Sequence, residues 1–447
     1  MFEKFMVELP KFENHVFDIR LFGAVGDGKT SNTAAFKEAI KAAHENGGRV
    51  VVPDGIWLTG PIELLSNVEL HLADNALIVF SKNIEEYPLI ITDFEGTDRI
   101  RTLSQIYANG AENIAITGFG TIDGNGHMWR PVKKWKMTER AWKELLEKSD
   151  CVIKSSDGEV WVPSRTIYDG YMAGEPSLED EDALEKAAPY YDFYRPAMVN
   201  FKHCDKVLIE GVTLQNSPAW NVHPYFCTNL TVRYATISNP YHAQNGDGID
   251  VESCRNVEIH HCRLQVGDDG ICIKSGKNAK ARQIEGPSEN IHIHHCKVGD
   301  SHGGFVVGSE MSRGVRNILV EDCTFINADV GIRFKSAFGR GGVVENIHIQ
   351  RINMYHIKED AMIFTMQYVL NTMGENEVVN VGSLAEDVPV FKNIYIRDCN
   401  CVGAKRGVRV EGMEWETPTI HDIAILNCNI RAEEENVLKH CSNVIVQ

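Results

Sequence analysis

One short pattern of alternating apolar and polar residues recurs along the chain. Alternation of this kind predicts a short β-strand. Most spacings between positions 206 and 346 lie at 23 to 34 residues, without helix-length amphipathic segments between them. Strands at this period predict a parallel β-helix, in which each repeat forms one coil and stacks on its neighbours. The copies are SNVELHL at 66, ENIAITG at 112, DKVLIEG at 205, TNLTVRY at 228, RNVEIHHC at 255, ENIHIHHC at 289, RNILVEDC at 316, ENIHIQRI at 345, KNIYIRDC at 392 and HDIAILNC at 421.

A helical pattern occupies part of residues 17–60, which we interpret as an N-terminal α/β capping segment. Its apolar residues fall on one helical face, and Gly47-Gly48 ends the helix. We expect this helix to cover the open end of the solenoid. The apolar positions are Ala35, Phe36, Ala39, Ile40 and Ala43.

The segment GAVGDGKT, from Gly23 to Thr30, satisfies the P-loop pattern. A P-loop also needs alternating strands and helices and a second strand that ends in an acidic residue. Only PLIITD at 88–93 is a candidate for that strand. Nucleotide binding is therefore not expected, and no cofactor is predicted.

Residues 124–195 interrupt the repeat within what we expect to be one β-helix domain spanning 1–447. The segment holds four of the seven tryptophans and an acidic helical run, LEDEDALEKAA. We interpret it as a helical or loop insertion that forms a lid or wall near a groove, or else an oligomer contact. The wall is favoured, and a homo-oligomer stays open. The tryptophans are Trp129, Trp135, Trp142 and Trp161.

Composition narrows the classes of partner. With 43% hydrophobic and 24% charged residues, we expect a soluble globular protein with a large core. A net charge of −17 disfavours nucleic acid and anionic membranes as partners. We see no secretory signal and no apolar run long enough to span a membrane, so a cytoplasmic location and reduced cysteines are expected.

Five cysteines each lie six residues after the asparagine position of their own repeat, which Asp422 holds in the repeat of Cys428. Phe119, Val212, Ala235 and Ile352 hold this place elsewhere, which predicts an inward apolar position filled by small buried thiols. The repeated His-His-Cys at 260–262 and 294–296 resembles a metal site. Alternation should turn the two neighbouring histidines to opposite faces, so no metal is expected there. The cysteines are Cys262, Cys296, Cys323, Cys399 and Cys428.

A second pattern lies downstream of the first in successive coils, as GIDVES at 248, GICIKS at 270, GFVVGS at 304, GIRFKS at 331 and GVRVEG at 407. Equivalent places on adjacent coils lie about 4.8 Å apart. Asp247 and Asp269 should therefore stack, with Asp268 beside them and His302 one coil further on. Arg333 and Lys335 should point the same way, two coils from Asp269.

Three carboxylates, an imidazole and a cationic pair on one stripe predict acid–base chemistry. Like charges this close should raise the pKa of one carboxylate. Glycoside hydrolysis needs such a pair, one acid for the leaving oxygen and one base for water. Arg333 and Lys335 could hold a sugar carboxylate. Taken alone, a Gly-Asp pair is a common turn and a lone cation is usually solvated. The prediction therefore depends on finding all of these side chains in one register.

Four short motifs carry a family resemblance: Asn245-Gly246-Asp247, Gly267-Asp268-Asp269, Ser301-His302-Gly303 and Arg333-Phe334-Lys335. In order and spacing the chain resembles the polygalacturonase family of glycoside hydrolases (family 28), right-handed parallel β-helix enzymes that hydrolyse pectin backbones. The resemblance runs from about residue 17 to the last coil, outside the insertion. Gly246, Ser301 and Phe334 depart from the family's threonine, glycine and isoleucine.

The resemblance also implies roles for individual residues. Asp268 resembles the general acid, Asp247 and Asp269 the pair that activates water, and His302 the histidine that supports the acid. Arg333 and Lys335 resemble the galacturonate-binding pair, and no metal is implied. NSPAWNVHP at 216–224 and GSEMSRG at 308–314 look like bacterial, exo-acting members, which adds further expected sugar contacts. These are Asn245, His223, Lys274, Glu310 and Arg313.

The expected function is an exo-polygalacturonase that hydrolyses α-1,4-galacturonosidic bonds of oligogalacturonides from the non-reducing end, with inversion. Three other functions stay open. One is an endo-polygalacturonase or a rhamnogalacturonan or xylogalacturonan hydrolase. Another is a pectate-lyase-type β-helix whose Asp247, Asp268 and Asp269 bind calcium. The last is a non-catalytic carbohydrate-binding β-helix.

Overall fold

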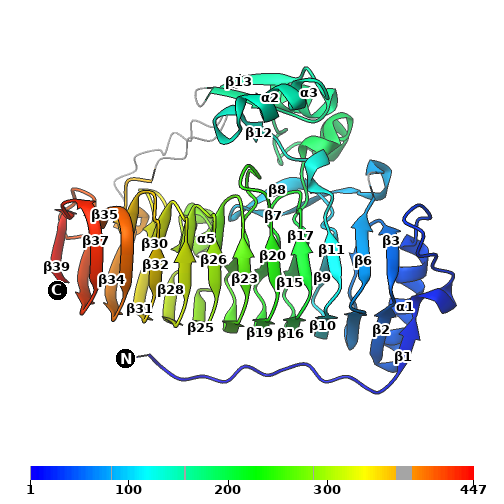
Figure 1. The fold of residues 1–447 in the computed structure, drawn as a ribbon, viewed down its shortest axis with the longest axis horizontal. Coiled ribbons are helices and arrows are strands. Elements are labelled where there is room, and N and C mark those ends of the chain that lie inside the picture. Colours follow the sequence, from blue (N-terminus) through cyan, green and yellow to red (C-terminus); the bar gives the residue numbers. More distant parts are fainter. Residues whose placement is uncertain (1, 82, 156–157, 285, 369–384) are drawn as a thin grey trace.

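The computed structural model describes residues 2–81, 83–155, 158–284, 286–368 and 385–447. Three ladders of parallel strands stack along one axis and form a right-handed parallel β-helix, as the sequence predicts (Figure 1). Within the described ranges, no helix is both long and apolar enough to cross a membrane.

The first ladder is a 13-stranded sheet that contains all ten copies of the first sequence pattern. Its strands are β1 (Val16–Asp18), β2 (Gly48–Val52), β5 (Val68–Leu72), β10 (Glu112–Gly118), β16 (Asp205–Glu210), β19 (Thr228–Arg233), β22 (Arg255–His260), β25 (Ser288–His294), β28 (Val315–Glu321), β31 (Val343–Gln350), β34 (Val390–Arg397), β36 (Ile420–Leu426) and β39 (Cys441–Val446).

The other two ladders share the long strand β35 (Asn400–Glu411). The second consists of β3 (Gly55–Thr59), β6 (Ala76–Phe80), β11 (Thr121–Asp123), β17 (Thr213–Gln215), β20 (Thr236–Ser238), β23 (Arg263–Gln265), β26 (Lys297–Gly299), β29 (Thr324–Ile326), β32 (Asn353–Tyr355), β35 and β37 (Asn429–Glu434). The third consists of β4 (Ile62–Glu63), β9 (Ile106–Asn109), β15 (Val199–Lys202), β18 (Val222–Tyr225), β21 (Ile249–Glu252), β24 (Asp269–Lys274), β27 (Gly303–Val307), β30 (Val330–Lys335), β33 (Asp360–Thr365), β35 and β38 (Val437–Lys439).

The recurring asparagine has a conformational reason. Asparagine holds eight of the ten equivalent positions, with Lys206 and Asp422 in the other two, and φ is positive at all ten, for example +57° at Asn290 and +55° at Asn317. Asparagine tolerates this left-handed region better than most residues. The side chains also bond from coil to coil, since Asn317 donates to Asn290 at 2.7 Å and Asn290 donates to Asn256 at 3.0 Å. The repeat therefore fixes both the bend of each coil and the register between coils.

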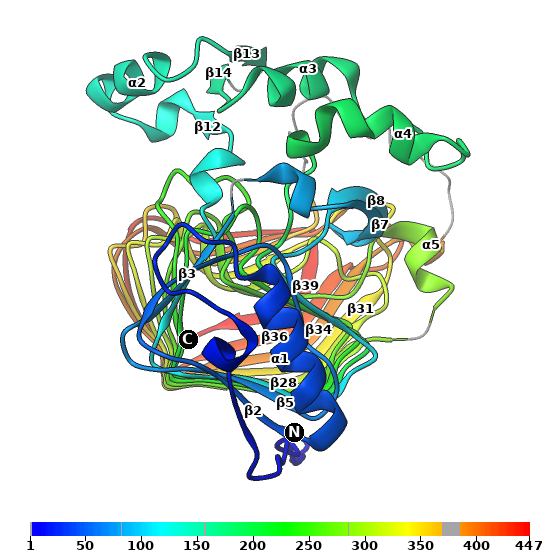
Figure 2. The same ribbon diagram turned by 90° about the vertical axis from the view of Figure 1, so that its right-hand side faces the viewer.

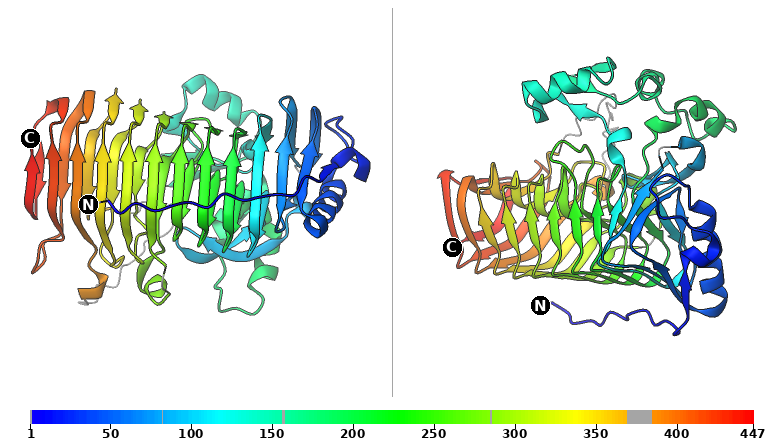
Figure 3. Two further views of the ribbon diagram at one scale, coloured as in Figure 1. Left: turned by 90° about the horizontal axis from the view of Figure 1, so that it is seen from below. Right: turned by 45° about the vertical axis from the view of Figure 1, so that its right-hand side comes forward.

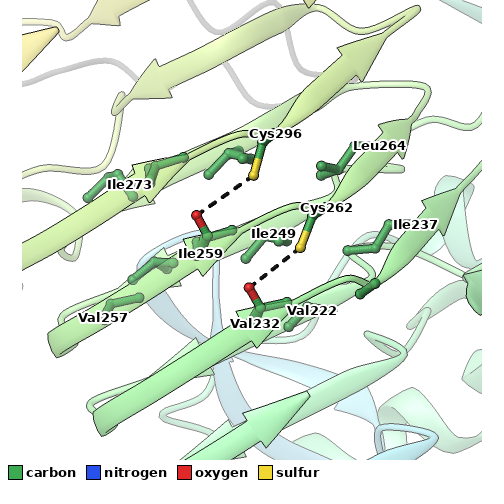
Figure 4. Close-up of a cluster of buried hydrophobic side chains, with 14 of the residues drawn as sticks. Val222, Val232, Ile237, Ile249, Val257, Ile259, Cys262, Leu264, Ile273 and Cys296 are labelled. Carbon is green, nitrogen blue, oxygen red and sulfur yellow. Dashed lines mark hydrogen bonds between the residues drawn. The ribbon is translucent and has the colours of Figure 1, made fainter. Parts of the chain in front are cut away.

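The interior of the coils is apolar, and the cysteines belong to it (Figure 4). Cys262, Cys296, Cys323 and Cys399 are buried free thiols, as predicted, while Cys428 is half-buried. Figure 4 shows the Cys262 and Cys296 thiols pointing to backbone carbonyls of the preceding coil.

The same prediction is wrong for Phe119, whose side chain is 71% exposed. Thr121 pairs with Thr213, so this coil has one extra residue and Gly120 takes the inward place that Val212 holds in the next coil. At Gly120 an added Cβ would lie 2.7 Å from the carbonyl oxygen of Ala73, so only glycine fits.

Alternation also fails for the paired histidines. His261 and His295 follow their strands in the left-handed conformation, with φ of +55° and +54°. Each therefore turns back beside its neighbour, and the Nδ1 atoms of His260 and His261 lie 2.9 Å apart. Both rings of each pair lie on the outer side of the sheet.

At the N-terminal end, helix α1 (Thr33–Asn46) covers the open end of the solenoid (Figure 2). Its buried residues are the five apolar positions predicted from the sequence. The P-loop-like segment is a turn between the short 3-10 helix Ile19–Phe22 and α1, in which the Asp27 carboxylate accepts the backbone N–H groups of Lys29 and Thr30. The candidate second strand is β7 (Leu89–Phe94), which pairs antiparallel with β8 (Thr97–Thr102) in a hairpin.

Residues 124–195 leave the solenoid and fold above it (Figures 1 and 2). They form a small antiparallel sheet and short helices, with Trp142 and Trp161 in a separate apolar cluster. The elements are β12 (Val132–Lys133), β13 (Val152–Ser155), β14 (Gly158–Trp161), α2 (Glu139–Leu146), α3 (Arg165–Ala173), α4 (Ala183–Ala187) and the 3-10 helices Gly126–Met128, Lys134–Lys136 and Ala188–Phe193. Elsewhere lie α5 (Asn278–Arg282) and the 3-10 helices Ile84–Glu86 and Ala385–Asp387.

The N-terminal tail runs back along the outside of the first ladder (Figure 3). The backbone N–H of Glu3 donates to Asn317 Oδ1 at 2.7 Å, and Asn317 Nδ2 donates to the Glu3 carbonyl at 2.9 Å. The tail is thus bonded into the asparagine ladder.

Candidate active site

Four neighbouring strands of the third ladder, β21, β24, β27 and β30, position the predicted catalytic stripe. Ile249 pairs with Ile271, which sets Asp247 beside Asp269 on the next coil. Asp269 pairs with Gly303, and Val306 pairs with Arg333. A cluster of charges from segments far apart in the sequence therefore follows from strand register alone.

The three aspartates are brought together. One carboxylate oxygen from each of Asp247, Asp268 and Asp269 lies within 4.8 Å of the others. Asp247 and Asp269 are buried, at 4% and 1% exposed, whereas the side chain of Asp268 is 22% exposed. Asp268 is thus the carboxylate most open to a ligand.

Two cations lie on the next coils. Lys335 Nζ donates to Asp269 Oδ2 at 2.7 Å, and Arg333 Nη1 lies 3.9 Å from Asp269 Oδ1. Burial is the largest effect and works against both charges, but Asp269 and Tyr368, with smaller contributions from other groups, together raise the pKa of Lys335 and of Arg333. Asp269 therefore lies between the two cations and contacts both of them.

Asp268 is surrounded by a histidine and a lysine. His302 Nδ1 lies 3.2 Å from Asp268 Oδ1, and Lys136 Nζ donates to His302 Nε2 at 3.0 Å. Because Nε2 accepts from the ammonium group, Nδ1 carries the ring proton and donates it toward Asp268. Burial acts to raise the pKa of Asp268, but His302, Lys136 and Lys335 overcome it and lower that pKa.

A raised pKa occurs instead at Asp247, and also at Asp250 three residues further on. Burial, Asp250 and Asp268 raise the pKa of Asp247 well above its usual value. Among the described residues, none donates a hydrogen bond to Asp247 Oδ1 or to either oxygen of Asp250, a fully buried carboxylate behind the cluster. The nearest cation to Asp250 is Lys274 Nζ, 3.7 Å from its Oδ1. A raised pKa on one member of the three was expected, and it falls on Asp247 and not on Asp268.

These groups line a pocket with a volume of about 230 Å³. Nine of the predicted residues border it, which adds Asn245, Lys274 and Glu310 to the catalytic stripe. The Asn245 amide oxygen accepts from Arg195 at 2.8 Å, and Glu310 accepts from Lys274 at 3.2 Å. The nine are Asn245, Asp247, Asp268, Asp269, Lys274, His302, Glu310, Arg333 and Lys335.

Two expected sugar contacts do not border the pocket. His223 is 1% exposed, donates from Nε2 toward Glu252 at 3.0 Å, and burial lowers its pKa to about 3. Arg313 donates to the Ala281 carbonyl and to Ser253 Oγ, at 3.2 Å each. Both side chains bond to other groups of the protein, as buried polar groups require.

Several pocket residues come from outside the repeat and were not predicted as sugar contacts. Trp135 and Lys136 belong to the insertion, and Glu95 lies at the tip of the β7–β8 hairpin. Trp135 is 58% exposed, unlike the other three tryptophans of the insertion. The cluster of tryptophans in residues 124–195 was the only sequence signal for these residues. The remaining additions are Lys133, Trp220, Gln244, Lys277, Ser309 and Tyr368.

Comparison with known proteins assigns the chain to a family. The model of Glycosyl hydrolases family 28 matches residues 186–382, which contain all four motifs. A solved structure, the hyperthermoactive exopolygalacturonase from Thermotoga maritima, is 32% identical with a TM-score of 0.78, and the match covers 98% of this chain and 93% of that one. The chain belongs to glycosyl hydrolase family 28. It is therefore a glycoside hydrolase of the polygalacturonase family.

Two curated relatives extend the family-28 assignment. A probable polygalacturonase from Vitis vinifera is 28% identical over 440 residues, covering 95% of this chain and 76% of that protein. An exo-poly-alpha-D-galacturonosidase from Dickeya chrysanthemi is 29% identical over 364 residues, covering 80% of this chain and 58% of that protein. This family-28 chain thus spans less than two thirds of the second relative's length.

Proposed function

We propose that this family-28 hydrolase is an exo-polygalacturonase, which removes galacturonic acid from the non-reducing end of oligogalacturonides. The observation that carries the proposal is three clustered carboxylates beside Arg333 and Lys335 in a small, walled pocket. The cations match the carboxylate that distinguishes galacturonate from a neutral sugar. The names of the Thermotoga and Dickeya relatives support the same substrate.

The binding of substrate would supply the acid that the free site lacks. In the free state Asp268 is ionised, because His302, Lys136 and Lys335 together outweigh its burial. A bound galacturonate carboxylate that pairs with Arg333 and Lys335 offsets their charge and adds a negative charge nearby. Both effects raise the pKa of Asp268, so that it can take up a proton and deliver it to the leaving oxygen.

Asp247 and Asp269 would hold the attacking water. Asp269, which accepts from Lys335, serves as the base, while Asp247, whose pKa is raised, donates a hydrogen bond to the same water. The proposal of inversion rests on the family resemblance. The oxygens within 4.8 Å are closer than the spacing of about 6.5–9.5 Å typical of inverting pairs, so spacing alone would favour retention.

Exo action is proposed from the size and walls of the pocket. About 230 Å³ is below the range of about 300–1,000 Å³ typical of sites for larger ligands, and suits one sugar ring. The hairpin residue Glu95 and the insertion residues Trp135 and Lys136 border the pocket, where an open groove would be needed to pass a polymer.

The test is a time course on trigalacturonate with product analysis. Exo action predicts galacturonic acid and digalacturonate as first products, and on long polygalacturonate only galacturonic acid as the early product. Mixed oligomers from the polymer at early times would contradict exo action.

Asp268→Asn should lower kcat by several orders of magnitude with the fold retained, because the acid is lost. The matched control is Asp300→Asn, on the neighbouring coil and outside the pocket lining, which should keep full activity. Proton NMR that identifies the anomer of galacturonic acid released first decides between inversion and retention.

The same assay separates the alternatives. A calcium-dependent lyase would give an ultraviolet-absorbing product and stop with a chelator. The structure disfavours it, because Lys335 and the Lys136–His302 pair already supply positive charge to Asp269 and Asp268, where calcium needs six to eight oxygen ligands. Affinity for the sugar without new reducing ends would indicate a binding module.

The cytoplasmic location and the homo-oligomer stay predictions, which cell fractionation and light scattering would test.

A further inference from the structure

A second cluster of ligating side chains lies on the first ladder, outside the catalytic stripe. His292 and His294 are two residues apart on β25, so their side chains leave the same face of the strand. Glu258 on the neighbouring strand β22 pairs directly with His292, and His260 pairs with His294. One ligand atom from each of Glu258, His292 and His294 lies within 4.8 Å of the other two.

The rings are oriented by contacts with further side chains. The Nδ1 atom of His294 lies 2.9 Å from His295 Nδ1, which leaves His294 Nε2 facing Glu258 at 3.3 Å. His292 Nε2 lies 3.0 Å from Glu321, on the next strand β28. Histidine ligands of metal ions are oriented in this way by a hydrogen bond to their second ring nitrogen.

The cluster is accessible to solvent. The side chains of His292, His294 and Glu258 are 25%, 16% and 36% exposed. An imidazole binds a metal ion through the lone pair of a ring nitrogen, so an ion that arrives from solvent can reach these rings.

We propose that Glu258, His292 and His294 bind one late first-row divalent transition-metal ion, with zinc as the representative. Two imidazoles and one carboxylate are ligands that zinc, copper and nickel accept, whereas calcium and magnesium require oxygen. Metal–ligand bonds of about 2.0–2.2 Å require ligand atoms about 3.3 Å apart. Small side-chain rotations of these half-exposed groups close the present spacing, and water completes the tetrahedron.

The bound ion would join two coils of the solenoid. Glu258 belongs to one coil and both histidines to the next, so the ion links β22 to β25 at the outer surface. Solenoid repeats contact mainly their neighbours, so such a link stabilises the folded state locally. Metal binding at this place does not involve the residues of the pocket.

The experiment uses tag-free, chelator-stripped protein in a reducing, zinc-compatible buffer. Titration calorimetry with zinc should give one saturable site of micromolar or tighter affinity, and zinc should raise the melting temperature. The double variant His292→Ala/His294→Ala should lose this site and the thermal shift, and Glu258→Gln should weaken binding at least tenfold. Circular dichroism checks that the variants fold.

Two controls make the result specific. His15→Ala removes an exposed histidine remote from the cluster and should leave zinc affinity unchanged. Asp268→Asn tests whether the catalytic carboxylates are the true zinc ligands, and it should also leave the affinity unchanged. Absence of saturable zinc binding overturns the proposal, as does unchanged affinity in the folded double variant.

Discussion

Asp247→Asn should make the protein more stable than wild type at neutral pH, although it removes a proposed catalytic group. The Asp247 carboxylate is buried beside Asp250 and Asp268, and its pKa is raised. A carboxyl group with a raised folded-state pKa costs stability as pH rises from its unfolded value, here 3.8, toward the folded one. Asparagine has no charge to bury, so the variant is free of this cost.

The magnitude can be estimated in two ways. At pH 7 the cost of keeping the group protonated cannot exceed about 4.4 kcal/mol, which is 1.36 kcal/mol for each pH unit above 3.8. The repulsion between two carboxylates about 4.8 Å apart is about 3.5 kcal/mol at an effective dielectric constant of 20. The first figure is an upper limit for the group, and the second is the repulsion at the largest separation of the pair, so the two agree in size. An imperfectly bonded buried amide costs about 1–3 kcal/mol. The net gain at pH 7 is therefore about 1–2 kcal/mol.

The assay is thermal unfolding of both proteins at pH 4 and pH 7. For 447 residues the unfolding entropy is about 0.9 kcal/mol/K, so 1 kcal/mol shifts the melting temperature by about 1 °C. The amide cost is equal at both pH values. The difference between variant and wild type should therefore move by about 3–4 °C in favour of the variant from pH 4 to pH 7, and change sign.

A pH-independent difference between the two proteins would refute the reasoning, because the charge of Asp247 would then cost nothing. The matched control is Asp360→Asn, at an equally buried carboxylate that pairs with Arg406 at 3.3 Å and Arg409 at 3.0 Å. There the substitution breaks ion pairs and should destabilise the protein at pH 7.

Three further predictions follow from other contacts. Lys136→Met removes a cation that lowers the pKa of the proposed acid, so the basic limb of the plot of kcat/KM against pH should move to higher pH. The control is Lys134→Met, at a solvent-exposed ion pair, which should leave that limb in place. Lys335→Met leaves the buried Asp269 side chain without its 2.7 Å ion-pair partner. The variant should lose about 3–5 kcal/mol of unfolding free energy and have a higher KM for trigalacturonate. An unchanged denaturation midpoint would contradict this. Asn290→Ala loses the ladder bonds and the left-handed preference, and should cost about 1–3 kcal/mol in chemical denaturation, whereas Asn290→Gly should cost less.

The coils could be predicted because one local requirement recurs in each of them. A left-handed residue before a short strand selects asparagine, and the alternation after it marks the buried face. The site could be predicted for a related reason, since strand register places Asp247, Asp269 and Arg333 on one stripe whatever the side chains are.

The failures have equally local causes. One extra residue in its coil exposes Phe119, and a left-handed residue after the strand puts His261 beside His260. Period-two reasoning holds only while the backbone stays extended. The walls of the pocket could not be predicted from the repeat. Glu95 and Lys136 reach the site through the tertiary folding of non-repetitive segments, for which the repeat supplies no register.

The insertion leaves the solenoid after β11 and returns at β15, and both strands still pair with the coils on either side. A long excursion therefore disturbs neither the stacking nor the placement of the acidic groups downstream. The insertion nevertheless supplies Lys136 to His302 and Arg195 to Asn245. Exchanging residues 124–195 would therefore keep the aspartates in register and change the cations that surround them.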